Sequence, residues 1–500
     1  MSKTLCLSAC LVALTALFPA RAAELGVLAP VAVAGKPQVQ DDPKGRPAPV
    51  VTRVRSGELF DQVQREAREG FLGTVLALDE QAQRIAGART TVPTWLYLSM
   101  EDGGFARRGF WLEESGKRRF VDEWFVDLVV DGDTVDDGGF EEIFTHEMGH
   151  VFLRRLLPGL PYGYSRTPHS SMSVTDAPTA FDEGFATHFQ GLVRRFSRNQ
   201  KLHEQTLGLD AKPFLSYWLS NLDRAGRIEG VRRNWFVQAQ LVPPGNDGEA
   251  LARANESTAF DTARLKNGQQ MLSSEGVIAT LFYRWLVPGE GGREAIVQRY
   301  SRLFRSLAGS RSWPELQPDS PVFLEVVDHY CADVPDDCAR VRAIVLDTTY
   351  GATADASLPR NTEAMAERGR IGDMAGYIEG LKQGRAQMKQ LHERVAAQPA
   401  LLRAALGPDL WLMGRSPVRL PGMPSQEVPV NLNTAEAEAL RSLPGVDAAT
   451  AERALRSRRE QGAFRDLADF VARSGVDAGA AASLRTAAEA MQRAGLYERR

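Results

Sequence analysis

The stretch Phe140 to Val151, written FEEIFTHEMGHV, constrains this chain more than any other part of the sequence. It carries His146, Glu147 and His150 in the spacing H-E-x-x-H. Positions i and i+4 of an α-helix lie on one face, so both imidazoles can reach one metal ion. Glu147 projects beside them, where it can take a proton from a water molecule bound to that metal. The stretch therefore predicts a metal-binding helix.

A catalytic zinc ion needs a third protein ligand and keeps a fourth position for water. A third histidine six positions after His150 would be one solution, but position 156 is a leucine. The other solution is a carboxylate on a second helix, and Ala180 to Gln190 (AFDEGFATHFQ) offers one. Its phenylalanines recur every fourth residue, as in a buried helical stripe. Glu183 lies off that stripe and is the predicted third ligand, and Asp182 is one option for a carboxylate that orients an imidazole.

HEMGH followed by DEGFATHF resembles the gluzincin metallopeptidases, in particular the aminopeptidase-N-like branch, whose third-ligand helix carries N-E-G-F-A. The resemblance implies that His146, His150 and Glu183 bind Zn²⁺ and that Glu147 is the general base and acid. It also implies a peptide or protein substrate and a zincin-like small sheet beside the active-site helices. It covers Thr94 to Leu286 at most.

The sequence departs from that family in the spacing of its ligands. Glu183 follows His150 by 33 positions, which is longer than the family's separation, so Leu156 to Thr179 is predicted to be an inserted loop. The family's G-x-M-E-N motif, which binds the substrate amine, has no good match upstream. Endopeptidase and exopeptidase activity therefore both remain open.

The donor that would stabilise the transition state is not fixed by the sequence. The family's tyrosine stands in Y-x-x-G-A, and the nearest match, SSEGV, has Ser273 at the tyrosine position. Tyr283, two helical turns further on, is the tentative transition-state donor. Tyr217, His188 and His169 stay as alternatives.

Residues 1–23 have the pattern of a secretory signal peptide. Lys3 supplies the positive end, Leu5 to Phe18 the apolar core, and Ala20 to Ala22 a small-x-small cleavage site. The apolar run is too short for a good membrane span, so no transmembrane span is expected in the mature chain. A lipoprotein signal ending at Cys10 would have almost no apolar core, which argues against it. The predicted location is secreted or periplasmic.

Cleavage near residue 23 would leave two cysteines, Cys331 and Cys338, in YCADVPDDCARV. A short loop containing proline in an exported protein favours a disulfide. Two thiols with no histidine close by would make a poor zinc site.

The expected fold class is α+β and mostly helical, and 43% hydrophobic residues are ample for real cores. The net charge of −3 gives no global attraction to nucleic acid or to an anionic membrane. A helix is expected over 58–77 and a helix broken by glycines over 361–394, with β-like runs at 94–100, 109–113 and 123–130. The predicted divisions are a leader or linker at 24–53, a zincin-like metallopeptidase domain at 54–345, a helical and Pro-rich linker at 346–428 and a last domain at 429–495.

The last domain, Val430 to Leu484, resembles the tandem helix-hairpin-helix module of the competence DNA-receptor (ComEA-type) family. The marks of the resemblance are NLNTA at 431–435, LPGV at 443–446, RSRR at 456–459 and GAF at 462–464. The family's hairpins read G-h-G and meet a DNA phosphate, whereas both hairpins here read Gly-Val-Asp, at 445–447 and 475–477. A carboxylate at that point opposes a phosphate. DNA binding through 429–495 is therefore disfavoured relative to a docking or structural role.

Two functions from different classes follow from the sequence. One is an exported zinc peptidase that uses a metal-activated water and a glutamate base. The other is a non-catalytic envelope protein that binds DNA or a protein partner through the helix-hairpin-helix domain.

Overall fold

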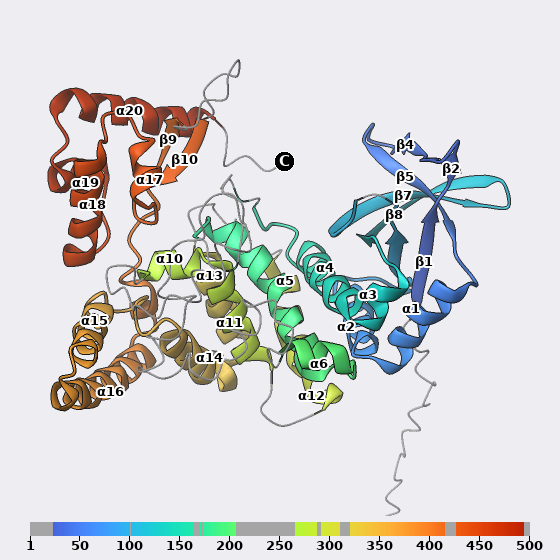
Figure 1. Ribbon diagram of the computed structural model, residues 1–500, viewed down its shortest axis with the longest axis horizontal. Coiled ribbons are helices and arrows are strands. Elements are labelled where there is room, and N and C mark those ends of the chain that lie inside the picture. Colours follow the sequence, from blue (N-terminus) through green and yellow to red (C-terminus); the bar gives the residue numbers. More distant parts are fainter. Residues whose placement is uncertain are drawn as a thin grey trace, which may run out of the picture.

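The computed structural model describes residues 24–100, 102–161, 163, 171, 174–206, 266–287, 292–310, 321–415 and 427–494. The fold is mixed, with a curled sheet, a helical body and a C-terminal helical module (Figure 1). This agrees with the expected α+β class. The predicted signal peptide at 1–23 lies outside the described residues, as do residues 162, 164–170 and 172–173 of the predicted insert. So do Tyr217 and His169.

The main sheet has the strand order β1-β6-β8-β7-β5-β4. β1 pairs with β6 in parallel and with β5 in antiparallel orientation, so the sheet curls back on itself. β7 pairs with β8 in antiparallel and with β5 in parallel orientation. The strand bounds are β1 Leu25–Pro30, β4 Val39–Asp41, β5 Pro47–Arg53, β6 Thr94–Leu98, β7 Phe105–Glu114 and β8 Lys117–Leu128; a separate hairpin pairs β2 (Ala32–Val33) with β3 (Lys36–Pro37).

The prediction of a structureless leader over 24–53 is wrong, because this segment supplies β1, β4 and β5. Its prolines concealed the strands, but they lie where a strand does not need an N–H. Pro30 ends β1, Pro37 ends β3 and Pro47 begins β5. β1 pairs with β6 and β5 pairs with β7, both of which are distant in sequence, and no local period predicts these pairings.

The two faces of the sheet contribute to different cores. The inner face encloses a small aromatic cluster: Leu28, Val51, Trp95, Tyr97, Phe110, Leu112 and Phe125. The outer face packs on the helices through the main core, which includes Leu96 and Val126. The predicted helix over 58–77 is in fact two, α1 (Glu58–Glu69) and α2 (Leu72–Ile85), because the chain turns at Gly70 and Phe71.

The helical body is built around α4 (Gly139–Leu156) and α5 (Ala177–Phe196). A buried ion pair joins them, because Arg194 donates to both carboxylate oxygens of Glu142 at 2.7 Å. The other helices are α3 Gly132–Asp136, α6 Gln200–Thr206, α10 Gly268–Leu272, α11 Glu275–Leu286, α12 Arg293–Gly309, α13 Val322–Asp333 and α14 Pro335–Thr348. Within the part of the chain that the structure describes, no helix combines the length and the hydropathy that crossing a membrane requires.

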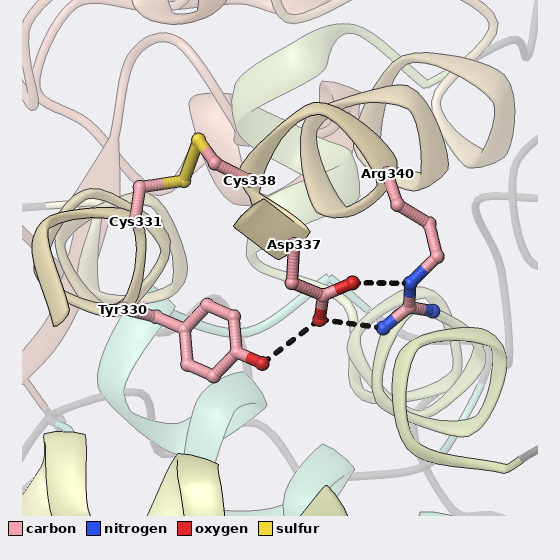
Figure 2. The surroundings of a disulfide bond; sticks show 5 residues. All are labelled: Tyr330, Cys331, Asp337, Cys338 and Arg340. Atoms are coloured by element: carbon pink, nitrogen blue, oxygen red, sulfur yellow. Dashed lines mark hydrogen bonds and ion pairs between the residues drawn. A yellow bond between two sulfur atoms is a disulfide. The ribbon is translucent and has the colours of Figure 1, made fainter. Parts of the chain in front are cut away.

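The predicted cysteine pair is joined by a disulfide, and its surroundings are shown in Figure 2. Cys331 lies in the last turn of α13 and Cys338 in the first turn of α14, so the bond closes a helix–helix turn and not the loop that the sequence suggests. Beside it, Asp337 accepts from the Tyr330 hydroxyl at 2.8 Å and from two nitrogens of Arg340. Burial and this carboxylate raise the pKa of Tyr330 to about 12.

The region predicted as a linker, 346–428, is folded over most of its length. The predicted helix broken by glycines over 361–394 is confirmed as two helices, α15 (Ser357–Arg370) and α16 (Met374–Ala397), which turn at Gly372 with φ of 83°. Leu391, Leu402 and Leu406 join the main core, so the domain that begins in the sheet does not end at 345. Residues 416–426, within the predicted Pro-rich part, lie outside the described residues.

The C-terminal module has a core of its own, centred on Leu432, Leu443, Phe464, Phe470 and Leu484. It begins earlier than predicted, because β9 pairs antiparallel with β10. Its elements are β9 Trp411–Arg415, β10 Glu427–Asn431, α17 Ala437–Arg441, α18 Ala448–Gln461, α19 Leu467–Ser474 and α20 Ala478–Arg493.

Replacing Arg194 by methionine tests the buried ion pair. The change leaves the Glu142 carboxylate buried without its bidentate partner, so we expect the free energy of unfolding to fall by about 3–5 kcal/mol. Chemical denaturation followed by circular dichroism measures it. The double variant Arg194→Met with Glu142→Met should recover most of the loss, since an apolar pair can replace a buried ion pair. An Arg194→Met protein as stable as the parent would contradict the assignment.

Candidate metal centre

The candidate site depends on a close crossing of α4 and α5. At the crossing, a Cβ added to Gly149 would lie 2.7 Å from the Cα of Ala186, which is closer than real Cβ atoms approach. A glycine on α4 facing an alanine on α5 therefore lets the two backbones nearly touch. Because Gly149 stands next to His150 and Ala186 follows Glu183 by three residues, the same crossing brings both ligand-bearing segments together.

The opposite side of α5 is covered by α11. A Cβ at Gly184 would lie 2.6 Å from Ile278 Cβ and 2.7 Å from the carbonyl oxygen of Glu275. The two small residues that flank Phe185 thus have different roles. Gly184 allows α11 to approach closely, and Ala186 allows α4 to do so. The phenylalanines of the predicted stripe are fully buried: Phe181, Phe185 and Phe189.

The helix that carries Glu183 begins at a strong cap. The Asp176 side chain accepts from the backbone N–H of Thr179 at 2.9 Å, and Pro178 lies in the first turn. Both features favour a helix start. Glu183 lies about two turns inside α5, where the helix is already regular.

His146, His150 and Glu183 form the one group of three metal-ligating side chains found among the described residues. One donor atom from each lies within 4.8 Å of the other two. The Glu183 Oε2 atom is 3.7 Å from His146 Nε2 and 3.5 Å from His150 Nε2. The three side chains keep 17%, 13% and 19% of their surface exposed, so solvent reaches the point between them.

This donor set fits zinc. Four ligands at bond lengths of about 2.0–2.2 Å around a tetrahedral ion stand about 3.3–3.6 Å apart, close to the two distances to Glu183. Two imidazoles and a carboxylate are a known set for catalytic zinc, which leaves a position for water or substrate. The residues present are therefore the ones that would hold the ion.

Asp182 fixes the orientation of one imidazole. Its Oδ1 atom lies 2.9 Å from His150 Nδ1, and its other oxygen accepts from Arg154. A proton on Nδ1 leaves the Nε2 lone pair directed at the metal position. Burial alone would lower the pKa of His150, but the Asp182 and Glu183 carboxylates outweigh it and raise that pKa well above its ordinary value. The Nδ1 atom of His146, by contrast, is buried and has no hydrogen-bond partner within the described residues.

Glu147 lies beside the ligands without joining them. It is 6% exposed, and burial raises the pKa of its carboxyl, although the nearby His150 and His146 charges work in the other direction. The backbone N–H of Ala106 in β7 also reaches this carboxylate and lowers its pKa. A carboxyl group held with a raised pKa near a metal site is suited to take up and release a proton.

Tyr283, the tentative transition-state donor, is not brought to the three ligands. Its hydroxyl accepts from Arg195 Nη1 at 3.3 Å. Arg195 lies in the last turn of α5, about 18 Å along the helix axis from Glu183 at 1.5 Å per residue. Tyr283 lies on α11, and its contact with Arg195 is at the opposite end of α5 from the ligands. We therefore do not retain Tyr283 as the donor.

His188, another alternative for that role, is a core residue. It is fully buried, and its ring nitrogens contact the carbonyl oxygen of Phe185 and the hydroxyl of Tyr300. Burial lowers the pKa of His188 to about 3, so the ring is neutral. It stabilises the packing of α5 on α12, and both of its ring nitrogens are already engaged there.

One buried residue near the site has no signal in the sequence. The Oε1 atom of Glu275 accepts from the hydroxyl groups of Ser171 at 3.0 Å and Thr187 at 2.9 Å. It thus ties the chain ahead of α5 to the middle of α5. In the sequence Glu275 is only a glutamate at the start of an apolar helix, which predicts a favourable interaction with the helix dipole and no cross-link.

Each hairpin of the C-terminal module ends in an aspartate that caps the helix after it. Asp447 caps α18 by accepting from Thr450 N at 2.7 Å, and Asp477 caps α20 by accepting from Ala480 N at 2.8 Å. A Cβ at Gly445 would lie 2.2 Å from the Ala480 Cβ, so the first hairpin packs directly against α20. The predicted carboxylates at both hairpins therefore occupy helix N-termini that would otherwise bind an anion.

Three of the module's arginines are engaged internally, whereas Arg456 and Arg459 are exposed on α18. Arg453 Nε donates to Ser474 O at 2.8 Å, and Arg458 Nη1 donates to Leu432 O at 2.8 Å. Arg473 donates to backbone carbonyls near the end of α18. Burial lowers the pKa of Arg458 to about 10. These three guanidinium groups hold the module together and are not presented to a nucleic-acid backbone.

Comparison with protein-family models matches residues 425–487 to the helix-hairpin-helix motif. Searches of curated proteins and of solved structures return no match. The matched region supports the helix-hairpin-helix fold and is compatible with binding nucleic acid or protein. It does not include α4 or α5.

Substituting Gly149 by alanine tests the α4–α5 crossing. The added methyl group would meet the backbone of Ala186, so we expect a loss of about 1–3 kcal/mol in stability and zinc binding weakened about tenfold or more. Thermal unfolding and zinc competition with a chelator measure the two effects. Gly309→Ala is the matched control, since a Cβ there meets no atom within 4 Å. Unchanged zinc affinity in Gly149→Ala would contradict the role of the crossing.

Proposed function

We propose that this protein is an exported zinc-dependent peptidase. The observation that carries the proposal is the convergence of His146, His150 and Glu183 from two helices, with Glu147 beside them. The H-E-x-x-H spacing alone has many false positives. A third donor from a second helix, 3.5 Å and 3.7 Å from the two histidine Nε2 atoms, makes the assignment much more specific. Export rests on the signal-peptide pattern of residues 1–23.

Each residue of the site has a role in this proposal. When bound, zinc would polarise the scissile carbonyl and lower the pKa of a water ligand towards neutrality. Glu147 takes the proton of the attacking water and delivers it to the leaving amine. Asp182 holds the His150 ring in the tautomer that presents Nε2. The donor that stabilises the oxyanion is left unassigned.

The position of β7 supports a peptide as substrate. The N-terminal half of β7 pairs with β8 on one side, and β5 pairs with β7 only at Trp111 and Leu112. Over its first residues β7 thus has one described strand neighbour, and at Ala106 its backbone reaches the Glu147 carboxylate. An open strand edge beside a general base can pair with an extended peptide.

Two single substitutions test the peptidase. We expect Glu147→Gln to keep near-stoichiometric zinc and to lose hydrolysis of a peptide library by about 100-fold or more. We expect Glu183→Ala to lose most of its zinc, because it removes one of three ligands. Elemental analysis and mass spectrometry of the cleaved library measure the two effects.

The matched control is Glu393→Gln, an exposed carboxylate on α16. It should leave zinc content and hydrolysis unchanged. Hydrolysis that persists undiminished in Glu147→Gln would show that the peptidase proposal is wrong.

The second candidate function is binding of DNA or a protein partner through the helix-hairpin-helix domain, which the family match favours. The capped hairpins and the internally bound arginines oppose DNA in particular. We therefore expect the full-length chain to give no salt-sensitive mobility shift with duplex DNA. A shift that weakens steeply with added salt would favour the second candidate.

A further inference from the structure

The helix-hairpin-helix module contacts the rest of the chain through the short helix α10, which lies between the module and the helical body in Figure 1. Asn267 and Gln270 form a reciprocal capping box at the start of this helix. Each also has an amide group left over, and each uses it on the module. Asn267 Nδ2 donates to Asn433 O, and Gln270 Nε2 donates to Thr434 O, both at 2.9 Å.

The two accepting carbonyls belong to the segment NLNT, residues 431–434, which is itself held rigidly. Asn433 donates to the carbonyls of Pro408 and Phe464 and accepts from Phe464 N at 2.7 Å. Asp409 accepts from Asn431 in the module and from Gln269 in α10. The docking surface is therefore preorganised and does not need to be ordered when α10 binds.

Most of this contact is buried, although Asn267 keeps part of its surface exposed. Lys266, which directly precedes the capping box, is fully buried, and so is Asn433. A Cβ at Gly268 would lie 2.6 Å from Ala352 O, and one at Gly407 would lie 2.5 Å from the Ala463 Cβ. Buried amide–carbonyl hydrogen bonds are costly to leave unmade, so the two amides of α10 select the docked position of the module.

The two residues that follow α10 contact the residues that directly precede α5. The carbonyl oxygen of Ser273 accepts from Thr175 N at 2.8 Å, and Ser274 forms a β-bridge with Val174. Glu275, the next residue, is the one that binds Ser171 and Thr187. These contacts hold both the approach to α5 and its middle, and Glu183 lies between them.

We propose that the helix-hairpin-helix module is an intramolecular partner of α10, and that its docking positions the first turns of α5 and with them Glu183. The partner of this domain is then the chain itself. Asn267 and Gln270 are positioning residues, which touch neither metal nor substrate. The inference about zinc rests on the proposed function, whereas the inference about α5 does not.

The double variant Asn267→Asp with Gln270→Glu tests this proposal in the full-length protein. Both new side chains keep the acceptor oxygens of the capping box, and aspartate is a favoured helix cap. The amide groups that bind the module become carboxylate oxygens that face the carbonyls of Asn433 and Thr434. The variant therefore breaks the docking contact while it keeps α10.

Amide hydrogen exchange and zinc competition with a chelator are the measurements. We expect backbone amides in 431–435 and 174–187 to exchange about tenfold faster or more, and zinc affinity to fall about tenfold or more. Amides of α1 and α2 should not change. The control variant Asn361→Asp with Gln390→Glu makes the same change of charge at exposed positions of α15 and α16 and should match the parent.

Two results would overturn the proposal. Unchanged exchange at 431–435 would show that these amides do not hold the module. Faster exchange at 431–435 with unchanged exchange at 174–187 would show that docking does not reach α5. A parent protein that binds no zinc would refute the peptidase proposal instead, and hydrogen exchange would still decide whether the module positions α5.

Discussion

The contact on which the rest of this structure depends is the near-touching of two helix backbones at Gly149 and Ala186. Metal ligands on separate elements must be held within a few tenths of an ångström, and regular helices do this better than loops. Here the spacing within α4 sets the two histidines, and the crossing sets Glu183 against them. The proposed third ligand can therefore come from a helix far along the chain, because the crossing places Glu183 whatever the length of the intervening segment.

The crossing is supported by three contacts. At the far end of α5, the buried Arg194–Glu142 pair joins it to α4 again, so the two helices cannot pivot freely about the glycine. On its other side α11 fits against Gly184, and Glu275 links α11 to Thr187. Helices α4 and α11 pack on two sides of α5. Glu183 lies off the buried phenylalanine stripe, on the narrow face that this packing leaves uncovered.

The sequence predicted what depends on local periodicity and did not predict what depends on distant partners. His146 and His150 share a face because of their spacing, and the phenylalanine repeat indicated where Glu183 would lie. The strands between 24 and 53 were missed because β1 and β5 pair with strands that lie about 60 to 70 residues further along the sequence, and because their prolines resemble a linker. Tyr283 was placed in the correct helix, but which end of that helix meets the ligands depends on packing.

The helix-hairpin-helix domain shows how far a family motif can be trusted. Its glycines, apolar residues and NLNT segment specify a fold, and that fold is present with its own core. Partner choice depends instead on the polar groups that remain unused. Here Asp447 and Asp477 take the helix N-termini, three arginines bind carbonyls within the module, and the carbonyls of Asn433 and Thr434 accept from α10. Since both hairpin N-termini and three of the arginines are already satisfied within the chain, the polar groups of this domain favour a partner inside the protein over a phosphate backbone.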